Sequence, residues 1–188
     1  MQNSLFSGER TALVALTQGR VLEVCFETGK NLHYYSPWVT SLSVVCLEGA
    51  STPMRHDAND RGLPVELIFP GSDAARLPFA DASFDWVVTT LALCRMTYPA
   101  AMLAEISRVL KPSGAYAFLE HGRSSDPAMA HRQMRLRKLW LDIGGCDLDL
   151  EIERIIGAAG LRIEKLDRYQ GQRPKFLSTM YQGMAKRV

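Results

Sequence analysis

The sequence predicts an α/β protein with a doubly wound, seven-stranded, mostly parallel sheet and one antiparallel strand. Two observations lead to this fold class. Short runs rich in β-branched and aromatic residues alternate with helical segments along the chain. Four of these runs are almost continuously apolar, which is typical of parallel strands that helices cover on both faces. Repeated strand–helix alternation of this kind produces a sheet with right-handed crossovers.

Seven segments have the composition of strands. The first, second, fourth and fifth are the near-continuous apolar runs, so we expect them inside the sheet. Only the short segment Tyr169–Lys175 separates the last two strands, which should therefore form an antiparallel hairpin. The predicted strands are Arg20–Cys25, Leu42–Leu47, Val65–Phe69, Phe84–Thr89, Gly114–Glu120, Arg162–Arg168 and Phe176–Met184.

Helices are expected between these strands. The helix that opens with Pro99 ends before the stop signal KPSG at 111–114. Another begins after Asp126, a residue type that caps helix amino termini, and a third ends at Gly160, a residue type that caps carboxyl termini. The predicted helices are Ala12–Thr17, Thr28–Tyr35, Ser51–Arg61, Pro99–Leu110, Pro127–Leu141 and Leu150–Ala159.

Composition and charge limit the class of protein. The 188 residues, 47% of them hydrophobic, suffice for one core, so we expect a single domain over 1–188 with a short helical segment at 1–19. The net charge is 22 − 20 = +2, which is too small to indicate a nucleic-acid partner. A signal peptide and an apolar run of about 20 residues are both missing. A cytoplasmic location is therefore expected.

The four cysteines indicate reduced thiols. They are Cys25, Cys46, Cys94 and Cys146, and they form no CxxC pair, which argues against zinc. Each lies in an apolar run, where a buried and unreactive thiol is the common outcome. No metal site is predicted.

Functional residues are expected at the carboxyl ends of the strands, because ligands of such sheets bind where the strand order reverses. The first strand leads into the sequence VLEVCFETGKN at 21–31. Glu48 follows the second strand, nineteen residues after Gly29, and an acid at this offset can accept both hydroxyls of a ribose. The third strand is followed by GSDAARLPF at 71–79.

Three longer stretches resemble the class I S-adenosylmethionine (SAM)-dependent methyltransferases, a family with a Rossmann-like fold. The most similar branch contains small bacterial quinone, phospholipid N-methyl and thiol S-methyl enzymes. The resemblance extends from Gly19 to the carboxyl terminus. Its stretches are ARLPFADASFDWVVTTLALC at 75–94, EISRVLKPSGAYAFLEHGRSSDP at 105–127 and IIGAAGLRIEKLDRY at 155–169.

The resemblance implies SAM as cofactor and gives roles to individual residues. Glu48 matches the acid that binds the ribose, while Asp73 and Ala74 match the pair that contacts the adenine edge. Thr90 and Leu91 are implied to lie under the methionine end of the cofactor. The complete implied set of cofactor-binding residues is Glu23, Cys25, Glu27, Gly29, Glu48, Asp73, Ala74, Thr90 and Leu91.

The glycine-rich motif departs from the family pattern E-x-G-x-G-x-G, because Cys25 and Glu27 replace two of its glycines. The motif is expected to form a loop outside the core, where Cys25 is a small intrusion. Glu27 would face the methionine carboxylate, and two like charges about 4 Å apart at an effective dielectric near 20 repel by roughly 4 kcal/mol, which predicts weak SAM binding. In the alternative, the loop rearranges, and Glu27 turns to solvent or pairs with the methionine ammonium.

Three further features bear on function. His121 ends the fifth strand and is a candidate general base; a loop histidine satisfied by backbone groups is the alternative.

The basic helix Met129–Leu141 could lie on an anionic membrane surface, although charges around a core-packing stripe are the favoured interpretation. About twenty residues precede Val21, fewer than in relatives, so a partner subunit or homo-oligomer could complete the cover of the site.

The leading hypothesis is SAM-dependent methyl transfer to a small or lipid-soluble acceptor. The alternative is a catalytically inactive methyltransferase-like protein that binds a partner or another ligand. The fold alone cannot choose between them.

Overall fold

The computed structural model describes residues 6–25, 30–46, 62–68, 76–171 and 179–188. Seven strands in these ranges form one sheet in the order β3-β2-β1-β4-β5-β7-β6. β7 runs antiparallel to both of its neighbours, whereas the first five strands are mutually parallel. This confirms the predicted fold class and the closing hairpin. The strands are β1 (Gly19–Cys25), β2 (Val39–Cys46), β3 (Val65–Ile68), β4 (Phe84–Thr90), β5 (Leu110–Gly122), β6 (Leu161–Gln170) and β7 (Thr179–Arg187).

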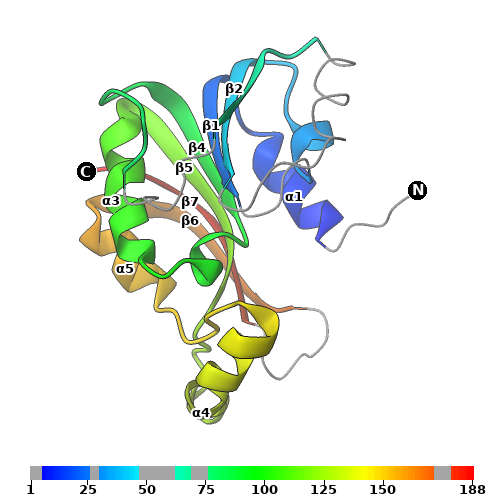
Figure 1. Ribbon diagram of the computed structural model, residues 1–188, viewed down its shortest axis with the longest axis vertical. Coiled ribbons are helices and arrows are strands. Elements are labelled where there is room, and N and C mark those ends of the chain that lie inside the picture. Colours follow the sequence, from blue (N-terminus) through cyan, green and yellow to red (C-terminus); the bar gives the residue numbers. More distant parts are fainter. Residues whose placement is uncertain (1–5, 26–29, 47–61, 69–75, 172–178) are drawn as a thin grey trace.

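Helices cover both faces of this sheet. The first helix, α1, lies over one face, while α3 and α5 lie side by side over the other (Figure 1). α4 lies beyond the carboxyl end of β5 and covers neither face (Figure 1). The helices are α1 (Ser7–Val14), α3 (Pro99–Val109), α4 (Pro127–Gly144) and α5 (Ile152–Ala158), with short 3-10 turns η1 (Leu32–Tyr34) and η2 (Leu93–Arg95).

The central strands are apolar on both faces because each face meets a helix layer. Leu22 of β1 belongs to the core on the side of α3, together with Leu103 and Ile106. Its neighbour Val21 belongs to the core on the opposite side, together with Val14 of α1. Full burial of such side chains contributes about 1.5–3 kcal/mol each to stability. Strands covered on both faces therefore carry apolar residues at nearly every position, and continuous apolar runs identify them in the sequence.

Two of the predicted helices are wrong in detail. α1 begins at Ser7, five residues before the predicted start at Ala12, and ends at Val14, whose carbonyl accepts both the backbone N–H and the hydroxyl of Thr17. The described part of the predicted helix Thr28–Tyr35 contains only the 3-10 turn η1. The predicted helix Ser51–Arg61 lies outside the described residues.

Strand β5 is longer than predicted and begins at Leu110 instead of Gly114. The segment KPSG at 111–114 does end α3, but it continues as strand. A register shift opposite it, between Phe84 and Trp86 of β4, absorbs the irregularity. β7 ends at Arg187, three residues after the predicted end at Met184.

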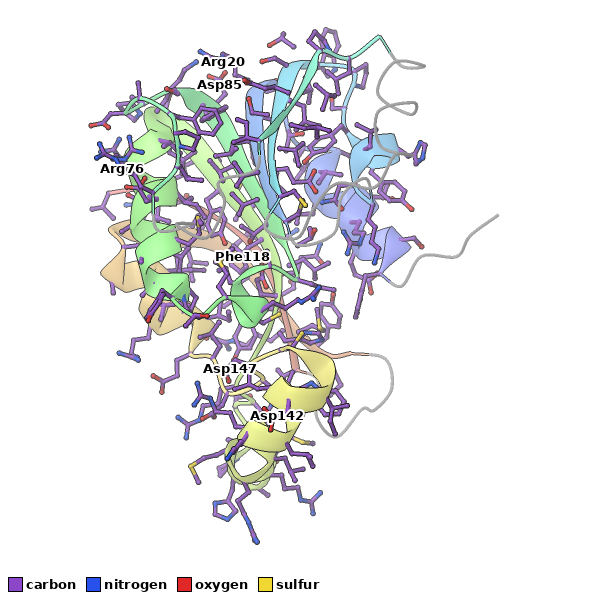
Figure 2. The ribbon with its side chains drawn as sticks, viewed as in Figure 1. Arg20, Arg76, Asp85, Phe118, Asp142 and Asp147 are labelled. Atoms are coloured by element: carbon purple, nitrogen blue, oxygen red, sulfur yellow. The ribbon has the colours of Figure 1, made fainter. Side chains whose placement is uncertain are left out.

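A charged cluster ties three strands together at their amino ends. Asp85 of β4 accepts the backbone N–H of Arg20 at 2.9 Å and the Nζ of Lys111 at 2.7 Å. Figure 2 shows Arg20 and Asp85 together at the upper edge of the sheet. Burial raises the pKa of Asp85, but the bonds with Lys111 and Arg20 outweigh it and leave that pKa lowered.

Arg108 of α3 fixes the segment that leads into β4. Its guanidinium donates to the carbonyls of Leu77 and Phe79 at 3.0 and 2.8 Å, and to Asp81 at 2.7 Å. Glu105 bonds to the same guanidinium and accepts the N–H of Leu77 at 2.9 Å. The hydrogen bond with Arg108 lowers the pKa of Glu105.

We expect Gly183→Ala to destabilise the fold by about 1–3 kcal/mol, the usual cost of overpacking. A Cβ at this position in β7 would collide with the backbone carbonyl oxygen of Lys165 and lie 2.7 Å from the Phe118 ring. Chemical denaturation measures the free energy of unfolding. Gly157→Ala is the matched control, because no atom lies within 4 Å of its new Cβ. It should preserve or raise stability, and equal effects of both substitutions would contradict the packing described.

We expect Glu105→Gln to reduce stability by roughly 1 kcal/mol at neutral pH. Because the folded-state pKa of Glu105 is lowered from 4.5, its contribution is present above that value and is lost as the pH falls through the lowered pKa. The difference in unfolding free energy between the two proteins should therefore shrink below about pH 4.5. A difference that stays constant down to pH 3 would contradict this assignment.

Candidate active site at the carboxyl edge of the sheet

The strand order reverses at β1, which lies between β2 and β4. A doubly wound sheet binds ligands beyond the carboxyl ends of its strands at this point. Those ends lie at the lower edge of the sheet, above α4 (Figure 1). Cys25 ends β1, Thr90 ends β4 and His121 is the penultimate residue of β5. The fold therefore brings these three predicted residues to one edge.

Glu23 carries a buried carboxylate whose two oxygens are both hydrogen-bonded. Glu23 is only 2% exposed to solvent. Asn31 Nδ2 donates to Oε1 at 2.9 Å and the Tyr35 hydroxyl donates to Oε2 at 2.6 Å. Burial raises the pKa of Glu23, and these donors, together with Arg10, offset part of the shift. The pattern at β1 predicted an important acid here, but not these donors.

Arg10 of α1 completes this network and was missed by the sequence analysis. Its Nη1 donates to Asn31 Oδ1 at 2.6 Å and to Thr90 Oγ1 at 2.9 Å. Asn31 Nδ2 also donates to Thr90, at 2.9 Å. Arg10 is 5% exposed and shares the buried face of α1 with Leu13 and Val14. A charged residue in an apolar i, i+3, i+4 pattern is the signal that could have identified it.

Leu91 turns the chain sharply as it leaves β4. Its φ is +53°, a conformation that bulky residues rarely adopt and that costs of order 1–3 kcal/mol. Its N–H donates to the carbonyl of Leu119 at 2.7 Å, which holds the turn against β5. Strained backbone of this kind is common where a chain is shaped around a ligand.

Glu120 of β5 fixes the chain that follows this turn. Its buried carboxylate accepts the backbone N–H groups of Ala92 and Cys94 at 3.1 and 3.3 Å, so it caps η2. Burial raises the pKa of Glu120, and bonds with Thr89 and with these backbone groups counteract the shift. Glu120 and His121 were both expected at this edge, but only His121 was assigned a role, as a candidate general base.

Two thiols and an imidazole meet beside Glu120. Cys94 Sγ lies 3.6 Å from His121 Nδ1. Cys146, from the segment between α4 and α5, joins them, and the three ligand-type atoms all lie within 4.8 Å of one another. The hydrogen bond with Cys94 lowers the pKa of the Cys146 thiol, and His121 lowers it further. The three residues come from three separate segments that were each expected near the site, and no motif in the sequence indicates that they meet.

The remaining cofactor-binding residues implied by the resemblance form a further group. Glu27, Gly29, Glu48, Asp73 and Ala74 lie outside the described residues, and their roles in cofactor binding stay predictions.

The expectation that the whole glycine-motif region lies outside the core is wrong for Cys25. This residue is 2% exposed, belongs to the core on the side of α1 and pairs in register with Cys46 of β2. Cys25 is the last residue of β1, where the predicted strand Arg20–Cys25 also ends, so its side chain belongs to the packed sheet and not to the loop that follows.

The interpretation of the apolar residues of the basic helix as a core-packing stripe is wrong for Met134 and Leu139, which are exposed, whereas Leu136 and Trp140 are half-buried. Within α4, Ala130 and Gln133 are buried, whereas Leu139 and Ile143 are 54% and 73% exposed. The reason is the position of α4 beyond the edge of the sheet, where no face is available to cover its apolar side chains (Figure 1). No helix in the described ranges has the length and apolar character needed to span a membrane.

The charges at this edge fit the amino-acid end of SAM. That end carries an ammonium and a carboxylate, and the site offers one buried guanidinium, from Arg10, and one buried carboxylate, from Glu23. Opposite charges in a partly desolvated site attract more strongly than in water. The charges of these two groups are complementary to those of a zwitterion, while both groups are almost fully buried and already bond to Asn31, Thr90 and Tyr35.

Comparison with known proteins identifies the family. A family model described as a methyltransferase domain matches residues 19–118. Thiol S-methyltransferase TMT1B of Homo sapiens is 33% identical over 162 residues, which cover 80% of this chain and 63% of the relative. The demethylmenaquinone methyltransferase of Roseiflexus castenholzii is 34% identical over 137 residues, covering 69% and 56%. The chain thus spans about three fifths of the length of these curated relatives.

Solved structures agree on the fold. The [4+2]-cyclase SpnF superposes with a TM-score of 0.73 at 20% identity, covering 95% of this chain and 78% of that one. The 1,6-didemethyltoxoflavin N1-methyltransferase of Burkholderia thailandensis, solved with S-adenosylhomocysteine, superposes with a TM-score of 0.70 at 15% identity, covering 100% and 80%. With a family match over more than half of its residues, this chain belongs to the class I methyltransferase family.

Proposed function

We propose that this protein transfers a methyl group from SAM to a small or lipid-soluble acceptor. The observation that carries the proposal is the Arg10–Glu23 network at the carboxyl ends of β1 and β4, where this fold binds its ligands. Membership of the methyltransferase family supports it. SpnF, named as a cyclase, shows that the fold can serve other reactions, but the comparisons give no support to an inactive protein.

Few side chains are needed for this chemistry. SAM, when bound, supplies an activated methyl group on a sulfonium, so the protein mainly orients the acceptor and excludes water. Arg10 and Glu23 are suited to orient the zwitterionic end of the cofactor. Phe6, buried at the start of α1 with its ring centroid 6.5 Å from that of His121, contributes an apolar wall. His121 is the candidate proton acceptor where the acceptor must lose a proton.

The acceptor class follows from two considerations. The relatives named above are a thiol S-methyltransferase and a demethylmenaquinone methyltransferase, so their acceptors are a soft nucleophile and a lipid-soluble quinone. In this chain, α4 presents exposed Leu139 and Ile143 beside basic residues, a composition compatible with an apolar acceptor or an anionic membrane surface. We include two further features in the proposal, contact with a membrane and a second subunit that covers the site. Membership of the family does not by itself imply either of them.

We expect isothermal titration to detect weak binding of SAM or S-adenosylhomocysteine. The heat should disappear in Glu48→Ala, because loss of the acid removes charge-assisted bonds to the ribose, each of which contributes about 1.5–3 kcal/mol. Glu164→Ala is the matched control, since this carboxylate lies on β6 at the far edge of the sheet, and it should bind normally. Absence of binding to either molecule at millimolar concentration would overturn the proposal.

We expect Glu27→Gly to tighten SAM binding at least tenfold, equivalent to about 1.4 kcal/mol. The gain should fall short of the full repulsion because solvent and side-chain rotation relieve part of it. The single substitution is preferable to a double change with Cys25→Gly, because Cys25 is buried and its removal would leave a cavity.

An unchanged affinity in Glu27→Gly would show that Glu27 does not obstruct the cofactor. Glu27→Gln then separates the two remaining interpretations. Weaker binding by Glu27→Gln would indicate a bond with the methionine ammonium, and unchanged binding would indicate a side chain that faces solvent.

A further inference from the structure

Cys94, His121 and Cys146 form a compact group of soft ligands, of which the proposed methyl transfer uses only His121, as the candidate proton acceptor. We propose that these three residues bind one Zn²⁺ ion and leave its fourth coordination position to water or to a thiolate from solution. The proposal concerns ion binding alone and is independent of SAM binding. The possible use of the open position by a thiol acceptor is the only part that rests on the proposed function.

The distances suit tetrahedral zinc. Zn–S bonds of about 2.3 Å and a Zn–N bond of about 2.0 Å place a sulfur and a nitrogen about 3.5 Å apart, and two sulfurs about 3.8 Å apart. Cys94 Sγ and His121 Nδ1 are 3.6 Å apart, and every pair in the group lies within 4.8 Å.

Surrounding contacts hold the backbone of Cys94 and of the segment that carries Cys146. The buried Glu120 carboxylate accepts the N–H of Cys94, and the Cys94 carbonyl accepts the N–H of Asp147 at 2.5 Å. Asp147 in turn forms a two-pronged ion pair with Arg137 of α4, with a shortest distance of 2.6 Å. Figure 2 shows Asp147 next to α4, at the end of the molecule opposite Arg20 and Asp85. These contacts limit the movement of the chain that carries the two cysteines.

The chemistry of the group selects the ion. Thiolate and imidazole ligands favour zinc over hard cations such as Mg²⁺ or Ca²⁺. Cys94 is buried while His121 and Cys146 are half-buried, so one side of the group can be reached from solvent. On binding, each thiol releases its proton to solvent and forms one Zn–S bond. Two thiolates then balance the charge of Zn²⁺.

Three protein ligands with one open position are typical of catalytic zinc sites. An ion here would lie at the carboxyl edge of β4 and β5, close to the proposed acceptor region. A thiol bound to it would lose its proton at neutral pH. Since His121 Nδ1 would then be a ligand, the imidazole would not act as the general base.

The test uses Co²⁺ as a spectroscopic probe for Zn²⁺, with the full chain reduced by a phosphine instead of a thiol. We expect one ion per chain, a thiolate-to-cobalt charge-transfer band in the near ultraviolet and the visible bands of tetrahedral Co²⁺. One equivalent of Zn²⁺ should remove these bands. Addition of a monothiol should shift the visible bands if the fourth position is open, and an unchanged spectrum would overturn that part.

Substitutions identify the ligands. Cys94→Ser, His121→Gln and Cys146→Ser should each weaken Co²⁺ binding at least tenfold. Cys46→Ala is the matched control, because this buried thiol lies on β2, outside the group, and it should retain the spectrum. Circular dichroism verifies that each variant is folded; Cys146→Ser is the most tolerant position because it is half-buried.

Three outcomes would overturn the proposal. The reduced chain could bind no stoichiometric Co²⁺ or Zn²⁺. The bands could persist unchanged in Cys146→Ser. Thiol titration could show that Cys94 and Cys146 form a disulfide. If the chain still bound no metal after this disulfide was reduced, the two cysteines would be a redox pair and not metal ligands. None of these results depends on SAM, so failure of the zinc site and failure of methyl transfer are distinguishable.

Discussion

The buried carboxylate of Glu23 is the constraint on which the arrangement of the site depends. An unpaired charge at this depth would cost several kcal/mol, and the chain satisfies it with Asn31 and Tyr35 and with the nearby charge of Arg10. These partners come from α1, from the turn at η1 and from the segment after it. The need to satisfy one acid thus draws separate segments to the carboxyl ends of β1 and β4, where the ligand of such a fold binds.

A second buried acid, Glu120, holds neighbouring segments at the carboxyl end of β5, as Glu23 does near the carboxyl end of β1. It holds η2 through two backbone N–H groups, and the strained turn at Leu91 directs the chain toward it. Asp85 and its partners join the same strands at the opposite edge. The strands are therefore fixed by half-buried charges at their amino ends and by buried acids at their carboxyl ends, the end at which a fold of this kind binds its ligand.

The strands of the sheet could be predicted because each one is indicated by residues that lie next to one another in the sequence. Continuous apolar runs mark strands covered on both faces, and each run can be recognised alone. The site was harder to predict, because its contacts join distant residues. Arg10 reaches Thr90 across 80 positions, and Cys94 meets His121 across 27, so neither pair leaves a motif. The helix expected at Thr28–Tyr35 was wrong for the same reason: Asn31 and Tyr35 bond to Glu23, and a 3-10 turn positions them.

We propose that the Arg10–Glu23 network receives the amino-acid end of the cofactor. A crystal structure of the chain with S-adenosylhomocysteine would test this role. The homocysteine carboxylate and ammonium are expected at the carboxyl ends of β1 and β4, on the side of Arg10 and Glu23. A cofactor bound at another edge of the sheet, or bound here with its amino-acid end directed away from this network, would exclude the role.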